Sequence, residues 1–153
     1  MKISEFLTSE SVVSSLKATD KRALIQELSE LLQSRVPMIQ KDELASILMD
    51  RERLSSTGIG EGVAIPHGKV PGLTHLVAAF GVSRNGVDFS SIDGKPTRMF
   101  FALLAPENSA GIHLKALARI SRLFKNPAFR SAILAATDAA QIHRLIVEED
   151  SRC

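Results

Sequence analysis

The chain has 153 residues, of which 44% are hydrophobic and 24% are charged, as in ordinary soluble globular proteins. Its net charge of +2 and its lack of basic runs interleaved with aromatic residues argue against nucleic-acid binding. No apolar stretch reaches the roughly 18 residues that a transmembrane helix needs, and the N-terminus lacks the pattern of a signal peptide. We therefore expect one cytoplasmic domain over residues 1–153, with no membrane insertion.

The first third of the chain predicts a short N-terminal segment and two helices. Residues 1–16 mix apolar pairs with serines, which indicates one helical turn and then a strand at residues 11–16. Apolar residues recur at helical spacing from residue 19 or 20 to about residue 36. A second stripe predicts a helix from residue 41 or 42 to about residue 53. The charges at residues 50–53 indicate a solvated helix end.

The middle of the chain predicts strands. A short strand is expected at residues 62–65, and the apolar runs at 76–82 and 97–104 are typical of buried strands. Between these runs, Asn-Gly at residues 85–86 predicts a tight hairpin turn, with an edge strand at 87–89.

The last third of the chain predicts helices. Apolar spacing indicates a helix over residues 112–124, and Pro127 suits the first position of a helix that ends near residue 135. Asp138 is placed to cap a last helix. With no internal repeat or linker, the pattern predicts a single α/β domain with central strands flanked by helices on both faces.

The most distinctive stretch is RERLSSTGIGEGVAIPHGKV, at residues 51–70. Glycines at positions 58, 60 and 62 let the backbone approach a ligand or partner closely, because no Cβ blocks the approach. Pro66 fixes its own φ, so His67 is expected on a stiff arm, in an uncrowded loop after a strand. Gly68 is expected to keep the space beside the imidazole clear. Such an imidazole suits chemistry on a small group.

The string GIGEGVAIPHGK resembles the active-site signature of the fructose/mannitol class of enzyme IIA domains, from the bacterial phosphoenolpyruvate-dependent phosphotransferase system. Thr-Gly-Ile-Gly together with Ala-Ile-Pro-His-Gly-Lys is most similar to the nitrogen-regulatory IIA branch. Length, element order and flanking motifs also fit, so the resemblance covers nearly the full chain. It implies a mixed sheet with helices on both faces and a phosphotransferase with a phosphohistidine intermediate.

The resemblance implies roles for three residues. His67 matches the phosphorylated histidine, Arg51 matches an arginine that assists the phosphoryl group, and His113 matches a second histidine that orients the first by hydrogen bonding. The chemistry is reasonable, since a neutral imidazole nitrogen is a nucleophile near pH 7. Phosphoryl transfer needs mainly positioning and charge stabilisation. The Arg51 guanidinium, loop N–H groups and the N-terminus of the helix at 112–124 could supply these.

Other motifs are incomplete. The glycines do not form GxGxxG, because residue 63 is valine, and Gly68-Lys69 is not followed by the Ser or Thr of a P-loop. Residues 55–57 lack the G-x-S-x-G elbow of a serine hydrolase. They are interpreted as polar loop formers, with Thr57 a candidate to line the site.

No cofactor or metal is expected. The histidines lack the closed ligand spacing of a zinc site, and His75 and His143 are interpreted as surface or packing residues. The lone cysteine, Cys153, excludes an internal disulfide and fits a reducing compartment as a tail thiol.

Two functions stay open at this point. In the first, a phosphocarrier of the HPr or nitrogen-HPr type phosphorylates His67, and the phosphorylation state regulates partner proteins, with potassium transport and sensor kinases as candidates. In the alternative, a sugar-specific IIA passes the group to a IIB domain for fructose or mannitol uptake. Residues 57–60 and Lys69 favour the first. The sequence does not identify the phosphoryl donor, the partner proteins or the oligomeric state. Nor does it show which nitrogen of His67 is modified, although the precedent in the resembled family is Nε2.

Overall fold

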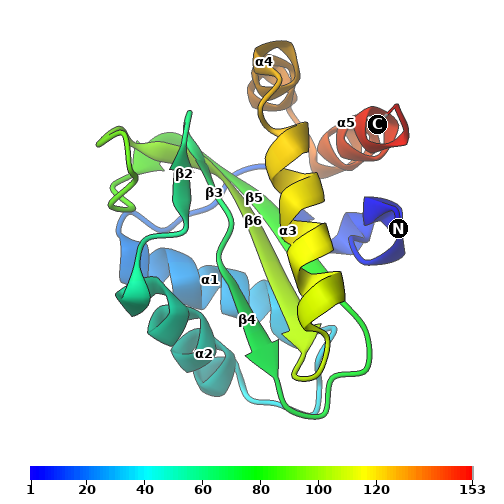
Figure 1. Ribbon diagram of the computed structural model, residues 1–153. Coiled ribbons are helices and arrows are strands. Elements are labelled where there is room, and N and C mark those ends of the chain that lie inside the picture. The colour runs from blue at the N-terminus through cyan, green and yellow to red at the C-terminus, as the bar shows by residue number, and fades with distance from the viewer. Residues whose placement is uncertain (153) are drawn as a thin grey trace.

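The computed structural model describes residues 1–152 and has three layers, with a mixed β-sheet between two layers of helices (Figure 1). Helices α1 and α2 cover one face, and α3, α4 and α5 cover the other. The predicted α/β class with helices on both faces is confirmed. The helices are α1 (Lys21–Gln33), α2 (Lys41–Leu54), α3 (Ala110–Leu123), α4 (Pro127–Ala135) and α5 (Ala139–Ser151), preceded by 3-10 turns η1 (Ile3–Glu5) and η2 (Ser9–Ser11). Cys153 lies outside the described residues.

The sheet is organised around its longest antiparallel pair, β5 and β6. Strand β1 runs parallel to the outer side of β5, and β3 and then β4 run parallel to the other side of β6. Strand β2 forms a hairpin with β3. The strands are β1 (Val12–Val13), β2 (Gly58–Gly60), β3 (Val63–Ala64), β4 (His67–Val70), β5 (Val77–Val87) and β6 (Thr97–Pro106).

Both faces of the β5–β6 pair are buried, which explains their continuous apolar sequences. Successive side chains point to opposite faces. Phe80 and Phe101 therefore pack under α3–α5, while Ala79 and Phe100 pack under α1 and α2. The predicted strands at 76–82 and 97–104 are confirmed, and both run further than expected.

The helix boundaries follow the capping residues closely. The carboxylate of Asp20 accepts a hydrogen bond from the Ala23 N–H at the start of α1, and Asp138 caps α5 in the same way. Helix α4 has the predicted bounds, beginning at Pro127. Helix α1 ends at Gln33, three residues before the predicted end, and residues after it continue as turns.

The hairpin predicted at residues 85–86 is wrong. Strand β5 continues through these residues to Val87, which pairs with Thr97. The pairing is irregular between Val82 and Val87, and Gly86 takes a φ of +81° there. The Asn-Gly pair thus forms an irregularity within the strand, and residues 88–96 make the connection to β6.

The segment from residue 58 to residue 70 also differs from its prediction. The glycine-rich stretch is a strand, β2, and His67 is the first residue of β4 instead of lying in a loop. The hairpin turn between β2 and β3 takes positive φ at Gly60, Glu61 and Gly62, which explains two of the three glycines. Within residues 1–152, no helix is both long and apolar enough to cross a membrane.

Candidate active site at the start of strand β4

His67 lies where β4 begins, on the sheet face that α3 covers. The residue pairs in register with Leu103 of β6, and the Leu103 N–H donates to the Pro66 carbonyl over 2.9 Å. Pro66 is buried and has a fixed φ, so the backbone immediately before His67 is restrained on both counts. The His67 side chain itself is only partly buried. The sequence predicted a restrained backbone at Pro66 and His67, and the pairing of β4 with β6 restrains it further.

A hydrogen bond at each ring nitrogen fixes the chemical state of His67. Nδ1 lies 2.8 Å from the Ile65 carbonyl oxygen, and Arg51 donates from Nε to Nε2 over 3.2 Å. A carbonyl can only accept and a guanidinium can only donate. The proton therefore sits on Nδ1, and the lone pair of Nε2 is directed to the Arg51 side. The ring is neutral, with Nε2 as its nucleophilic atom.

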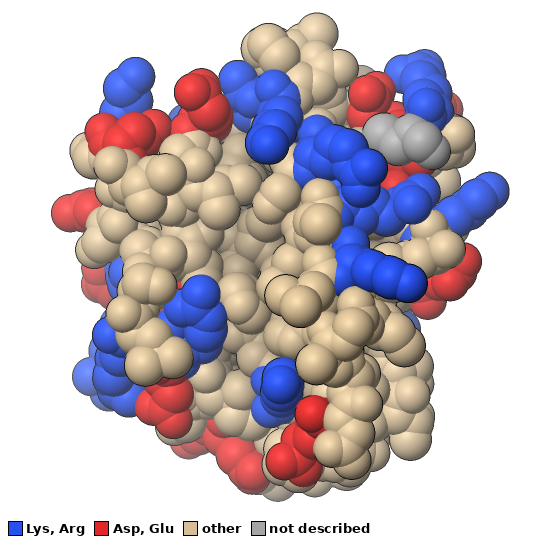
Figure 2. Space-filling view, viewed as in Figure 1, with Lys and Arg blue, Asp and Glu red and all other residues tan. Residues whose placement is uncertain are grey.

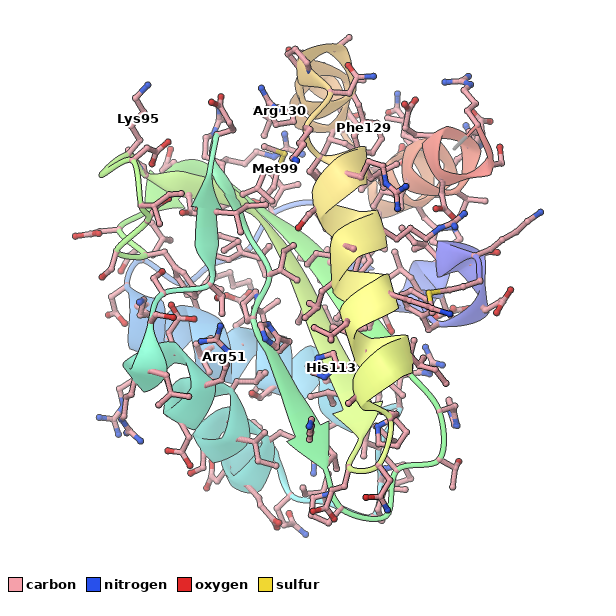
Figure 3. The ribbon with its side chains drawn as sticks, in the orientation of Figure 1. Arg51, Lys95, Met99, His113, Phe129 and Arg130 are labelled. Carbon is pink, nitrogen blue, oxygen red and sulfur yellow. The ribbon has the colours of Figure 1, made fainter. Side chains whose placement is uncertain are left out.

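Arg51 reaches this nitrogen from the far side of the sheet. It projects from the last turn of α2, the helix layer opposite α3, and passes the edge formed by β4 (Figure 3). Its Nη1 donates to the Ser55 carbonyl over 2.9 Å, which anchors the guanidinium just after the helix end. Arg51, which was predicted to assist the phosphoryl group on His67, thus contacts that histidine directly.

Gly68 has a different purpose from the one predicted. A Cβ at this position would lie 2.5 Å from Cγ2 of Ile47 on α2, on the face of β4 away from the imidazole. Gly68 therefore permits α2 to pack closely against β4. Ile47 is one helical turn before Arg51, so this close approach is what brings the guanidinium within reach of His67.

His113 completes the group from the other side. It lies in the first turn of α3 and is 7% exposed, and Figure 3 shows it pointing toward the β4 segment. The His113 and His67 rings meet edge to face, with centroids 5.2 Å apart and planes at 79°. The expected hydrogen bond between the two histidines is absent from the described contacts. Instead, Nε2 of His113 is buried with no hydrogen-bond partner among residues 1–152.

Both histidines are held in the neutral form. Burial lowers the pKa of His67 below its ordinary value, the Ile65 carbonyl opposes this, and the Arg51 charge adds to the lowering. Burial also lowers the pKa of His113, to about 4, with smaller contributions from His67 and Lys69. At neutral pH the site therefore presents an unprotonated Nε2 beside one fixed guanidinium.

Thr57 and Glu52 lie behind the site, and sequence reasoning misplaced both. Thr57 is buried against the Glu52 carboxylate instead of lining an open site, and Glu52 is 6% exposed instead of solvated. The helical spacing of the sequence does indicate that Glu52 is buried. It follows Leu44 and Leu48 at intervals of four, on the buried stripe of α2.

Basic side chains follow the site along α3. Residues 108–137 contain no Asp or Glu, and Figure 2 shows Lys and Arg gathered over the upper, C-terminal part of α3. Lys69 adds a further exposed cation on β4, two residues after His67. Leu114 is 67% exposed, next to His113. This face thus combines apolar contact area with positive charge. The basic residues of the segment are Lys115, Arg119, Arg122, Lys125 and Arg130.

The remaining histidines lie apart from this group. His75 is exposed, and Nε2 of His143 lies 3.0 Å from the Leu7 carbonyl oxygen, which agrees with surface and packing roles. Within residues 1–152, no three His, Cys, Asp or Glu side chains gather as a metal site would require.

The sequence pattern of one protein family matches nearly all of the chain. Residues 5–149 match the family described as "Phosphoenolpyruvate-dependent sugar phosphotransferase system, EIIA 2". The chain belongs to this EIIA type 2 family. The predicted family is therefore confirmed, and with it a role as a phosphotransfer protein of this system.

Relatives of two kinds are similar to this EIIA protein. A nitrogen regulatory protein of Bradyrhizobium diazoefficiens is 37% identical over 148 residues, which is 95% of each chain. A fructose-specific EIIABC component of Bacillus subtilis is 35% identical over 150 residues, which is 98% of this chain but 24% of that protein. Among solved structures, nitrogen regulatory protein IIA-Ntr from Neisseria meningitidis has a TM-score of 0.89 and 33% identity, covering 94% of this chain and 98% of that one.

The packing at Gly68 yields a test of how Arg51 is positioned. We expect Gly68→Ala to displace α2, to cost about 1–3 kcal/mol of unfolding free energy and to raise the pKa of His67, because the guanidinium moves away. Urea denaturation and NMR titration of the histidine rings measure the two effects. Adding Ile47→Ala should reverse the pKa change. Gly111→Ala, which adds its methyl in open space, is the control. An unchanged His67 pKa in Gly68→Ala would contradict this account.

The buried His113 predicts a dependence of stability on pH. Its pKa is about 4 in the folded chain and 6.5 ordinarily, so between these values the unfolded chain binds a proton that the folded chain excludes. The free energy of unfolding should therefore fall as pH decreases through this window. We expect His113→Gln to lose less stability than the wild type between pH 7 and pH 5 in urea denaturation. His75→Gln, at an exposed site, should keep the wild-type slope, and identical slopes in all three proteins would contradict the assignment.

Proposed function

We propose that this EIIA protein accepts a phosphoryl group on Nε2 of His67 from a phosphocarrier of the HPr or nitrogen-HPr type. The observation that carries the proposal is the pair of hydrogen bonds on the ring, from Nδ1 to the Ile65 carbonyl and from Arg51 to Nε2. Together they hold a neutral imidazole with the lone pair of Nε2 next to a cation. This is the arrangement that a histidine nucleophile for phosphoryl transfer needs.

The transfer step follows from these contacts. The Nε2 lone pair forms a bond to phosphorus while the bond from phosphorus to the leaving atom of the donor breaks. The ring then carries a positive charge, which the Nδ1–H hydrogen bond to the Ile65 carbonyl stabilises. The Nε–H of Arg51, which contacts Nε2 before transfer, is placed to donate to the oxygens of the arriving phosphoryl group.

His113 has a supporting role in this proposal. Its buried Nε2 has no protein partner in residues 1–152, and an unpartnered buried polar atom is costly. With a pKa of about 4, His113 is neutral at physiological pH, so it can donate from Nε2 if the proton sits there. A phosphoryl oxygen on His67 would accept this hydrogen bond. His113 thus favours the phosphorylated state over the free state.

The phosphorylation state of His67 then regulates partner proteins, in nitrogen metabolism or potassium handling. The similarity to a nitrogen regulatory protein over 95% of both chains supports this role. A phosphoryl group would add negative charge to a face that carries Lys69 and exposed apolar side chains of α3. A partner with an acidic contact surface would bind the unphosphorylated form more tightly, since the added charge weakens the attraction.

The decisive test is the mass of the intact protein after incubation with phosphoenolpyruvate, enzyme I and each candidate phosphocarrier. We expect one phosphoryl increment in the wild type and in His75→Ala, and none in His67→Ala. Arg51→Ala should keep the increment but acquire it on the order of 100-fold more slowly, because one charge-stabilising donor is lost. Measurements belong at mildly basic pH, since phosphohistidine is acid-labile. An increment retained in His67→Ala would refute the assignment.

A sugar-transport role is the second candidate, in which a IIB domain receives the phosphoryl group from His67. The 35% identity to a fructose-specific EIIABC component supports it, although the chain spans 24% of that protein. Growth of a deletion strain separates the two roles. We expect normal fructose and mannitol uptake with altered nitrogen or potassium phenotypes, and loss of uptake of one sugar would establish the transport role instead.

A further inference from the structure

Glu52 is a buried carboxylate that the phosphoryl transfer step does not use. Its side chain is 2% exposed and accepts hydrogen bonds from Lys21 Nζ at 2.9 Å, from the Thr57 N–H at 3.0 Å and from the Thr57 hydroxyl at 2.5 Å. Lys21 in turn lies 4.6 Å above the Phe89 ring. Burying a charge is costly, and a well-packed apolar residue in its place is often no less stable. Stability alone therefore explains this carboxylate poorly.

The contacts of Thr57 lead to the reactive histidine in two steps. The Thr57 carbonyl accepts from the Ile65 N–H over 3.0 Å, and the Ile65 carbonyl accepts from Nδ1 of His67 over 2.8 Å. Glu52 thus fixes Thr57, Thr57 holds the backbone of Ile65 at its N–H, and the Ile65 carbonyl fixes one nitrogen of the ring. Arg51, the residue before Glu52, contacts the other nitrogen.

We propose that Glu52 is a positioning residue for His67, which acts through Thr57 and Ile65 to hold the proton on Nδ1 and leave Nε2 free for the phosphoryl group. The proposal rests on His67 being the phosphoryl acceptor. The tautomer of a neutral histidine is set by the hydrogen bond that one nitrogen makes. If the Ile65 carbonyl turns away, Nδ1 loses the acceptor for its proton, and Arg51 alone then opposes the Nε2–H tautomer, in which the nucleophile is blocked. The end of α2 therefore controls both nitrogens, one through Arg51 and one through Glu52.

The proposal differs from a purely structural role in what it changes. A structural ion pair between α1 and α2 would alter the stability of the fold and leave the His67 tautomer untouched. A positioning role changes the tautomer and the rate constant for transfer. It leaves the KM for the phosphocarrier unchanged, because Glu52 and Thr57 are buried and cannot contact the carrier.

The test compares Thr57→Val, which keeps the side-chain shape but removes the hydroxyl, with Thr57→Ser, which keeps the hydroxyl. Glu52→Gln is the second variant, in case Thr57→Val folds poorly. Glu30→Gln, which removes the exposed ion pair with Lys41, is the matched control. Long-range proton–nitrogen NMR reports which nitrogen of His67 carries the proton, and single-turnover transfer from the phosphocarrier gives the rate constant and KM.

We expect Thr57→Val and Glu52→Gln to show a mixture of tautomers and a rate constant at least about tenfold lower, with KM unchanged. Thr57→Ser and Glu30→Gln should resemble the wild type in both measurements. A pure Nδ1–H tautomer with a wild-type rate in both Thr57→Val and Glu52→Gln would overturn the proposal. A wild type that accepts no phosphoryl group would overturn the proposed function instead, while the tautomer measurement would still decide the role of Glu52.

Discussion

The two hydrogen bonds on the His67 imidazole are the constraint on which the site depends. One partner is a carbonyl two residues earlier in the chain, and the other is a guanidinium from the opposite helical layer. A histidine with only the first would have the correct tautomer but no charge beside it. With only the second, Arg51 would still keep the proton off Nε2, but no acceptor would hold the Nδ1–H in place and orient the ring. Both are needed to present a neutral nucleophile beside a cation.

The hydrogen bond from Arg51 to Nε2 exists because α2 packs unusually close to β4. Gly68 has no side chain toward α2, so Ile47 packs directly on the backbone of β4. Arg51 can therefore extend past the edge of β4 to His67. On the other face, α3 brings His113 into edge-to-face contact with His67. The site thus draws one residue from each of the three layers, and the sheet edge is where these layers meet.

The surroundings of the site suit a protein substrate. Exposed Leu114 and Ile112 lie beside His113 at the start of α3, and the rest of that helix carries cations without any acidic residue. The His67 side chain is only partly buried, so a partner protein can reach it. Under the proposed function, this surface would contact the phosphocarrier, and a second partner would respond to the charge of phosphorylated His67.

The sequence by itself determined the family, the fold class and most helix and strand positions, and it indicated the histidine that we propose as the phosphoryl acceptor. Capping residues and apolar spacing are local signals, and the motif around His67 is contiguous. The tertiary structure decided the rest. His67 lies in β4 instead of a loop, residues 85–86 belong to β5, and Glu52 is buried. These features were not predicted, because strand pairing and burial depend on partners distant in sequence. The tertiary structure also gave Gly68 its purpose, since the side chain that needs the space belongs to α2, 21 residues earlier at Ile47. No pattern along the chain encodes that contact.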